Sequence, residues 1–140
     1  MKKKSKNIQT VLDILKDEIK GNTKDALEKM TKNYSMTWVY KTQGGKLFPR
    51  STNKNKKELK NIYKIKGRKY DIKNVAEGNN VVMVELVESY PDQKTKKVYR
   101  TPLVLVLEMK NGKIRKGRHY CDPRISYLYL SKKQVNKAFR

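Results

Sequence analysis

Two segments, VVMVELVESY at residues 81–90 and VYRTPLVLVLEM at residues 98–109, most strongly limit the folds open to this chain. Both are rich in β-branched residues and both are followed by turn-forming residues, so each predicts a β-strand. In the second segment, leucine alternates with valine along residues 103–107, which makes both sides of the strand apolar. Such a strand needs cover on both faces of its sheet.

Helical patterns precede these strands. Apolar residues recur at helical spacing over residues 8–19, and Gly21 is placed to end this helix. A second helix is expected at residues 22–30, and the short gap between the two predicts an antiparallel helical hairpin. Alternation over residues 34–42 predicts an early strand, and a basic segment at residues 54–67 predicts a third helix.

The remaining strands follow one another closely. The Asn-Gly pair at residues 111–112 is a strong hairpin signal, and it leads into a last long strand at residues 113–121. After it, residues 124–130 suggest a further extended segment, whereas Ser131 is placed to cap a short terminal helix. The expected organisation is a basic arm at residues 1–6, one α+β domain at residues 7–130, and a C-terminal tail or short helix at residues 131–140.

The charge of the chain is strongly positive. Its 140 residues include 35 Lys and Arg against 13 Asp and Glu, for a formal net charge of +22. Such a charge indicates a partner rich in phosphate or acidic groups, or an A-rich genome that encodes many lysines. Most of the basic residues are Lys, whereas recognition of bases and phosphates relies on Arg, so the pattern favours composition over nucleic-acid binding.

Several classes of protein are excluded by what the sequence lacks. One Cys and one His cannot form a disulfide framework or supply four ligands to a structural zinc ion. No apolar run is long enough to span a membrane, and none follows the basic start as in a secretory signal. Phosphate-binding and dinucleotide-binding loops are also missing. We therefore expect a cytoplasmic protein without a metal, a cofactor or a membrane partner.

Four short motifs occur in a familiar order: GNTKDALEKM, MTWVY, EGNNVVMVEL and LVLEMKNGKIRKGRHYCD. Together they resemble the nuclear-transport-factor-2-like superfamily, and within it the SnoaL-like branch. In that branch a Gly-Lys-Ile turn enters a last strand that ends in Tyr-x-Asp, and residues 112–114 and 120–122 match this pattern. The resemblance covers residues 7–128.

The resemblance implies a cone-shaped, strongly bent antiparallel β-sheet wrapped around N-terminal helices. It also implies an apolar cavity at the open end and a homodimer formed through the sheet. Relatives include ketosteroid isomerase, limonene epoxide hydrolase, scytalone dehydratase and polyketide cyclases, and other members only bind ligands or proteins. The expected function is binding of an apolar small molecule, with cofactor-free acid–base chemistry if the protein is an enzyme. The alternative is a basic interaction module that binds nucleic acid or an acidic protein without catalysis.

Asp122 matches the active-site Asp of the epoxide hydrolase and cyclase members. A carboxyl at the mouth of an apolar cavity can exchange protons, but an Asp followed by Pro123 more often ends a strand in a turn. Strand alternation places Arg118, Tyr120 and Asp122 on one side. It places His119 and Cys121 on the other, so His119 and Asp122 are not expected to form a dyad.

Other candidates come from the strands. Trp38 and Tyr40 share a strand side with Met36, as core residues or as cavity lining. Glu85 lies within an apolar strand, where Arg100 or Arg118 would pair with it in a cross-strand ion pair or a polar pocket floor. The catalytic candidates are thus Asp122, Tyr120 and Tyr40, and the expected ligand pocket contains Trp38, Met83, Glu85 and His119.

A basic surface is also expected. The densest run of positive charge lies between residues 56 and 69, with Tyr63 interleaved, as on some nucleic-acid-binding surfaces. A solvated helix face is the favoured explanation, because such runs of charge usually face water. The residues assigned to this surface are Lys56, Lys57, Lys60, Lys64 and Arg68.

Overall fold

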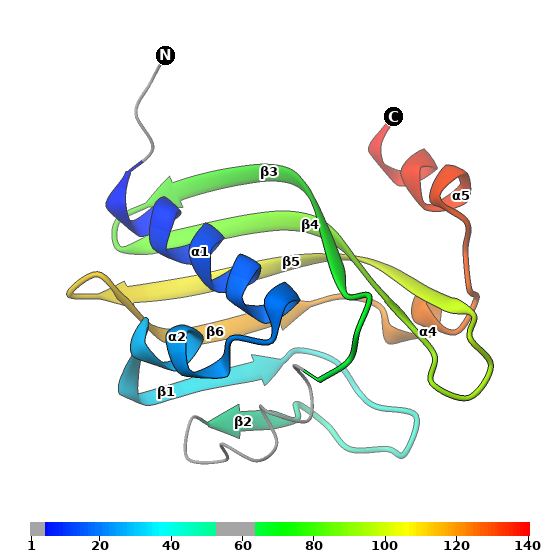
Figure 1. Cartoon of the computed structure of the whole chain (residues 1–140), viewed down its shortest axis with the longest axis horizontal. Coiled ribbons are helices and arrows are strands. Elements are labelled where there is room, and N and C mark those ends of the chain that lie inside the picture. Colours follow the sequence, from blue (N-terminus) through cyan, green and yellow to red (C-terminus); the bar gives the residue numbers. More distant parts are fainter. Residues whose placement is uncertain (1–4, 53–63) are drawn as a thin grey trace.

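Over residues 5–52 and 64–140, which the structure describes, two helices lie across one face of a six-stranded sheet (Figure 1). The structure is a computed structural model. The helices are α1 (Lys6–Lys20), α2 (Thr23–Glu28), α4 (Pro123–Ser126) and α5 (Lys132–Asn136), and a 3-10 turn, η1, spans Lys137–Phe139. The strands are β1 (Met30–Trp38), β2 (Arg50–Thr52), β3 (Lys69–Gly78), β4 (Val81–Pro91), β5 (Val98–Lys110) and β6 (Lys113–Tyr120). The third helix expected at residues 54–67 falls largely outside the described residues.

The first helix begins and ends at the residues that the sequence indicates. The Ser5 hydroxyl accepts a hydrogen bond from the Ile8 amide at 3.1 Å, which caps the start of α1. Gly21 ends α1 with φ of 74°, a left-handed conformation that costs glycine nothing. The Asn22 side chain, at the N-terminus of α2, makes no capping hydrogen bond to that helix.

The sheet has the strand order β2-β1-β6-β5-β4-β3 and curves strongly without closing (Figure 1). All its neighbouring strands are antiparallel except β1 and β6, which run parallel. The expectation of a wholly antiparallel sheet is corrected at this pair. The hairpin with β5 makes β6 antiparallel to β5. The first strand, β1, follows α2 and runs in the same direction as β6. The parallel pairing aligns Trp38 with His119, at the end of the sheet away from the turn between β5 and β6.

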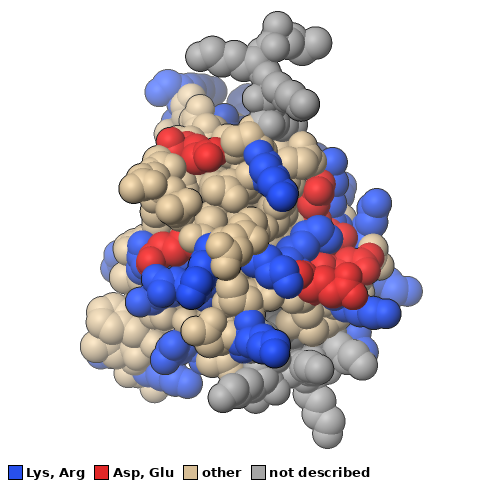
Figure 2. Space-filling model, turned by 90° about the vertical axis from the view of Figure 1, so that its left-hand side faces the viewer, with Lys and Arg blue, Asp and Glu red and all other residues tan. Residues whose placement is uncertain are grey.

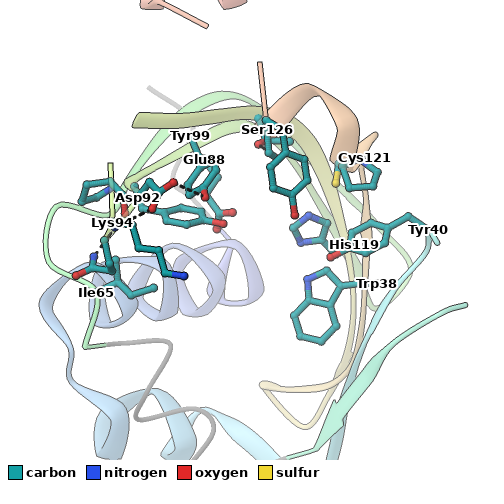
Figure 3. A pocket seen from close by; sticks show the side chains of 16 residues that line it. Trp38, Tyr40, Ile65, Glu88, Asp92, Lys94, Tyr99, His119, Cys121 and Ser126 are labelled. Carbon is teal, nitrogen blue, oxygen red and sulfur yellow. Dashed lines mark hydrogen bonds between the residues drawn. The ribbon is translucent and has the colours of Figure 1, made fainter. Parts of the chain in front are cut away.

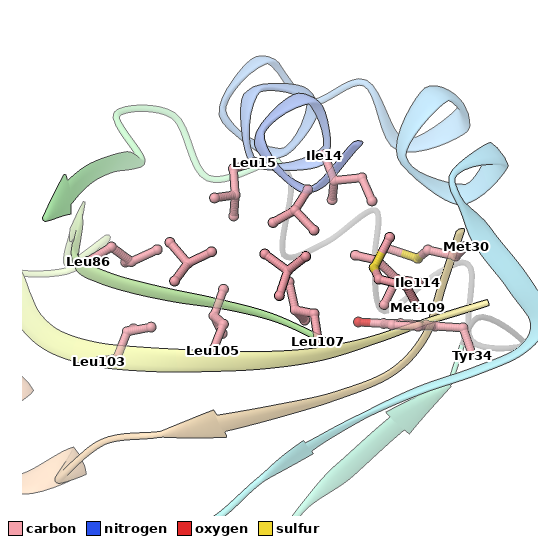
Figure 4. Close-up of a cluster of buried hydrophobic side chains, with 13 residues drawn as sticks. Ile14, Leu15, Met30, Tyr34, Leu86, Leu103, Leu105, Leu107, Met109 and Ile114 are labelled. Atoms are coloured by element: carbon pink, nitrogen blue, oxygen red, sulfur yellow. The ribbon is translucent and has the colours of Figure 1, made fainter. Parts of the chain in front are cut away.

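Alternation along β4, β5 and β6 decides which side chains face the helices. Leu105 pairs with His119 and Leu107 pairs with Gly117, so these positions share the inner face. A register shift between Glu108 and Met109 absorbs an extra residue of β6. The apolar core lies on this inner face, under α1 (Figure 4). It contains Val11, Ile14 and Leu15 of α1 together with Val82, Val84, Leu86, Leu103, Leu105, Leu107 and Met109 of the sheet.

The outer face is partly covered by the C-terminus of the same chain. Residues 123–126 form α4 where an extended segment was expected, because the Asp122 side chain and Pro123 start a helix there. Arg100 of the outer face donates a hydrogen bond to the Leu130 carbonyl at 2.8 Å, and Val135 of α5 is buried. At this end the second sheet face is therefore covered within the chain itself. Elsewhere it exposes apolar surface, notably the Met83 side chain at 45%.

The terminal helix α5 depends on a capping box. The Ser131 hydroxyl accepts from the Gln134 amide at 3.1 Å, and the Gln134 side chain accepts from the Ser131 amide at 2.9 Å. Ser131→Ala is expected to lower the free energy of unfolding by about 1 kcal/mol, because the Gln134 amide loses its hydrogen-bond acceptor. Urea unfolding measures the change. Ser131→Asp keeps a capping acceptor and serves as the control, and equal stability of Ser131→Ala and the wild type would contradict the prediction.

Candidate functional site

A cavity opens where the curved sheet extends beyond the apolar core. It consists of an outer pocket of about 590 Å³ and an inner pocket of about 390 Å³. We treat the two as one cavity because they share several walls. The shared residues are Trp38, Tyr40, Ile65, Glu88, Tyr90 and His119.

One wall of this cavity is aromatic and comes from the parallel pair of strands. Trp38 and Tyr40 follow each other on the inner side of the chain at the end of β1, and His119 lies beside them on β6 (Figure 3). The His119 ring centroid lies 6.2 Å from that of Trp38 and 6.3 Å from that of Tyr40. The imidazole therefore packs beside two large rings and is half-buried in the cavity wall.

The floor of the inner pocket carries a buried ion pair. An Arg68 guanidinium nitrogen lies 2.7 Å from a Glu88 carboxylate oxygen, and the two side chains are 7% and 18% exposed. The guanidinium also lies over the Tyr90 ring, 4.7 Å from its centroid. The Tyr70 hydroxyl donates a hydrogen bond to the Glu18 carboxylate of α1, next to this pair. Among the described residues, the Arg68 Nε is the one buried side-chain nitrogen or oxygen without a hydrogen-bond partner.

Burial determines the protonation of the cavity side chains. It raises the pKa of Glu88, although the Arg68 charge opposes this shift. It lowers the pKa of His119 to about 4, so the imidazole is neutral at neutral pH. It also raises the pKa of Tyr40 to about 12 and that of the Cys121 thiol to about 12. The cavity thus holds a neutral imidazole, a protonated phenol and an unreactive thiol.

The mouth of the outer pocket is organised by Asp92, in the turn after β4. The Asp92 carboxylate accepts hydrogen bonds from the hydroxyls of Tyr99 and Tyr129, both at 2.9 Å. It also accepts from the Lys94 amide at 2.9 Å, and these bonds hold the pKa of Asp92 well below its usual range. Asp92 and Lys94 lie across the opening from Trp38 and His119 (Figure 3).

Solved structures share this architecture. An NTF2-like protein from Cytophaga hutchinsonii superposes with a TM-score of 0.65 and 16% identity over 93% of this chain and 100% of that one. An LEH-like epoxide hydrolase of M. tuberculosis gives 0.71 and 15% over 96% of each chain. A protein of Jannaschia sp. CCS1 described as a SnoaL-like polyketide cyclase gives 0.70 and 13% over 94% and 99%. No protein-family model and no curated protein matches the sequence.

The chain therefore has the NTF2-like fold. The expected α+β cone is confirmed, and the similarity reaches across nearly the whole chain. At these identities the similarity establishes the fold, and the chemistry of the site must be argued from its own residues.

Within the NTF2-like fold, three of the predicted site residues come together. Trp38, Tyr40 and His119 all line both pockets. The alternation predicted for β6 is also observed, since His119 faces the cavity whereas Tyr120 is 41% exposed and lines neither pocket.

Asp122 is separated from these residues. Its side chain accepts from the Arg124 amide at 3.0 Å and so caps α4. The Arg124 guanidinium, 2.9 Å away, lowers the pKa of the Asp122 carboxyl further. Asp122 lines neither pocket, so the structure gives it the turn role that the sequence also allowed.

Met83 and Glu85 were expected in the pocket and lie on the opposite face of the sheet. On β4 the inner positions are Val82, Val84, Leu86 and Glu88, so residues 83 and 85 must point outward. Glu85 accepts a hydrogen bond from the Asn74 amide nitrogen at 2.8 Å.

The expected ion pair of Glu85 with Arg100 or Arg118 is also not formed. Arg118 lies 2.5 Å from Glu108, and Arg100 donates to a backbone carbonyl. Both arginines therefore have partners elsewhere on the outer face.

Arg68 does not belong to the predicted basic surface. Its side chain turns inward after Gly67, which has φ of 87°, and its charge is neutralised by Glu88. Lys64 is exposed as expected, and Lys56, Lys57 and Lys60 lie outside the described residues. Figure 2 shows Lys and Arg side chains interspersed with acidic and uncharged ones at one end of the molecule.

Sequence reasoning missed the pairing at the centre of the cavity. Glu88 stands at the end of an alternating series with Val82, Val84 and Leu86, and this spacing was a usable signal for an inward carboxylate. Arg68 was hidden within a run of lysines, where nothing in the sequence distinguishes a buried cation. Asp92 and Tyr99 were missed because they meet only through the turn between β4 and β5.

Residues 5–52 and 64–140 contain neither a clustered metal site nor a membrane-spanning helix. No group of three or more His, Cys, Asp or Glu side chains is arranged to hold a metal ion there. No helix in this part of the chain is long and apolar enough to cross a membrane.

Proposed function

We propose that this protein binds an apolar small molecule in the cavity formed by the outer and inner pockets. The observation that carries the proposal is a cavity of ligand size whose wall combines the Trp38 and Tyr40 rings with the polar groups of His119 and Glu88. Ligand sites in proteins are typically concave, largely apolar and supplied with a few converging polar groups.

We further propose that the chemistry available in this cavity is cofactor-free proton transfer. Glu88 is the acid–base candidate, because burial raises the pKa of its carboxyl toward the range useful for exchange at neutral pH. The neutral His119 imidazole and the protonated Tyr40 phenol are suited to donating hydrogen bonds to an oxygen of the ligand. The epoxide hydrolase and polyketide cyclase descriptions of two structural neighbours are in keeping with such chemistry.

The alternative of a basic interaction module receives less support from the described residues. Arg68 is internal rather than part of a surface, and the basic side chains on the face in Figure 2 are mixed with acidic ones. A homodimer through the exposed part of the outer face, around Met83, stays a prediction, as does a cytoplasmic location.

Binding can be tested with dansylamide, a neutral apolar fluorophore. Trp38 is the single Trp of the chain and lies in the cavity wall, so a probe bound there must accept excitation energy from it. We expect saturable energy transfer in the wild type. Cys121→Phe, which fills the outer pocket, should weaken binding by tenfold or more, on the order of 1.4 kcal/mol.

Met83→Phe adds a ring on the opposite face of the sheet and is the matched control. It should bind dansylamide as the wild type does. Circular dichroism must show that both variants are folded. Absence of saturable transfer in the wild type, or equal binding by the two variants, would contradict a ligand site in this cavity.

A further inference from the structure

The charge of the cavity wall is opposite in sign to that of the whole chain. The chain has a net charge of +22, yet the described charged residues that line the two pockets are three acids and two bases. The acids are Glu18, Glu88 and Asp92, and the bases are Arg68 and Lys94. The Arg68 charge is already compensated by Glu88 at 2.7 Å, and Lys94 is exposed at the mouth. The outer pocket alone is lined by Glu88 and Asp92 against Lys94, so a positively charged ligand group would meet more acidic than basic side chains there.

Aromatic faces add to this preference. The outer pocket is lined by five large aromatic side chains, Trp38, Tyr40, Tyr90, Tyr99 and Tyr127. Tyr99 is central, because its ring centroid lies 5.1 Å from that of Tyr90 and 6.0 Å from that of Tyr127, and its ring is stacked on that of Tyr129 at 5.2 Å. The electron-rich faces of such rings attract cations, and several rings together hold quaternary ammonium groups.

The rings at the mouth are also polarised by a fixed anion. Tyr99 and Tyr129 both donate their hydroxyl protons to the Asp92 carboxylate, which increases the electron density of each ring. Neighbouring rings already attract cations of the protein itself. Arg68 lies over Tyr90 at 4.7 Å and Lys97 lies over Tyr129 at 5.3 Å from the ring centroids.

We propose that the outer pocket takes the cationic alkylammonium group of a ligand whose remaining body is apolar. The aromatic cluster of Tyr90, Tyr99 and Tyr127, together with the Asp92 charge, would hold the ammonium group. The wall formed by Trp38 and His119 would contact the apolar body. This inference rests on the proposed function, because it names the chemical class of the ligand that occupies the same cavity. An anionic ligand would instead have to approach Asp92 and Glu88 with Lys94 as its one uncompensated cation among the described lining residues.

Two probes of the same shape separate charge from hydrophobicity. (3-Hydroxyphenyl)trimethylammonium and 3-tert-butylphenol differ in one central atom, which is a charged nitrogen in the first and a carbon in the second. Calorimetric titration of the full chain with each probe gives the two affinities. We expect the ammonium probe to bind at least about tenfold more tightly, equivalent to about 1.4 kcal/mol.

The outcomes distinguish this inference from the function on which it rests. Equal affinity, or tighter binding of 3-tert-butylphenol, would overturn the preference for a cation while leaving a small-molecule site in place. Binding of neither probe would overturn the cation inference, and the dansylamide experiment then decides separately whether the cavity binds any apolar molecule.

Matched variants locate the effect. Asp92→Asn removes the negative charge at the mouth and should weaken the ammonium probe severalfold without changing the neutral one. Asp71→Asn removes the same charge from an exposed side chain on β3 and should change neither. Tyr99→Phe keeps the ring and should retain most of the preference, whereas Tyr99→Leu should lose it. An ammonium preference that survives both Asp92→Asn and Tyr99→Leu would overturn the assignment to this pocket.

Discussion

Replacing Arg68 with methionine is expected to lower the free energy of unfolding by about 3–5 kcal/mol. The Arg68 guanidinium is 7% exposed and lies 2.7 Å from Glu88, so its removal leaves a carboxylate buried without a counter-charge. Urea unfolding at neutral pH, followed by circular dichroism, measures the loss. A change below about 1 kcal/mol, the range typical of an exposed ion pair, would show that this pair is more hydrated than the structure indicates.

A surface arginine provides the matched control. Arg115 also pairs with a glutamate, Glu108, at 3.2 Å, but its side chain is 47% exposed. Arg115→Met should therefore change the free energy of unfolding by no more than about 1 kcal/mol. The contrast between the two substitutions separates the effect of burial from the loss of an arginine as such.

The sign of the pH dependence gives a second check on the Arg68 variant. Burial raises the folded-state pKa of Glu88 above its ordinary value of 4.5, and Arg68 counteracts that rise. In Arg68→Met the folded-state pKa of Glu88 must rise further. The contribution of protonated Glu88 to the free energy of unfolding is then lost as pH increases through this raised pKa. The difference in the free energy of unfolding between the wild type and Arg68→Met should thus become smaller as pH falls from neutral toward about 4.5. Adding Glu88→Gln, which removes the buried charge, should recover much of the stability at neutral pH.

The second large effect concerns His119. Its pKa falls from 6.5 to about 4 on folding because burial disfavours the imidazolium. A lowered histidine pKa stabilises the fold above the unfolded-state value, and this contribution is lost as pH falls from 6.5 through about 4. The loss amounts to about 3 kcal/mol, from the free-energy equivalent of each pKa unit. His119→Gln has no imidazole, so it should not show this part of the acid destabilisation.

Comparison of the wild type with His119→Gln isolates this contribution, because other groups titrate in the same range. Glu88, which shares the cavity, acts in the opposite direction, since acid protonates a carboxyl that burial already favours as neutral. Asp92 and Asp122 lose hydrogen-bonded carboxylates at still lower pH. His119 is the single His of the chain, so an NMR titration of its ring protons is unambiguous. A midpoint near 6.5 would contradict a buried imidazole.

Most of the fold could be predicted from local patterns. The helical spacing before Gly21 and the alternation along residues 81–109 are set by short-range rules, and the structure follows both. The parallel pairing of β1 with β6 could not be read in this way, because no local pattern encodes which distant strand lies alongside another. The α4 turn was missed because Asp122 followed by Pro123 suits both an extended segment and a helix start.

The candidate site was predictable only where alternation decides it. Trp38, Tyr40 and His119 were named among the candidates and all three reach the cavity, although the sequence left open which face of the sheet lines it. Met83 and Glu85 were misplaced because an apolar strand gives no indication of which face is inner. Arg68 was unpredictable for a different reason, since its burial depends on a partner twenty residues away in the sequence.

The pairing of β1 with β6 also has a consequence for how the protein folds. Trp38 and His119 are separated by most of the chain, and they become neighbours only when the first strand docks against the last one. Long-range contacts of this kind form late, because closing a long segment costs entropy before any contact repays it. The helices and the three-stranded meander of β3, β4 and β5 can assemble locally, but the cavity wall is completed in the final docking step. The fluorescence of Trp38 therefore reports on that docking step during refolding.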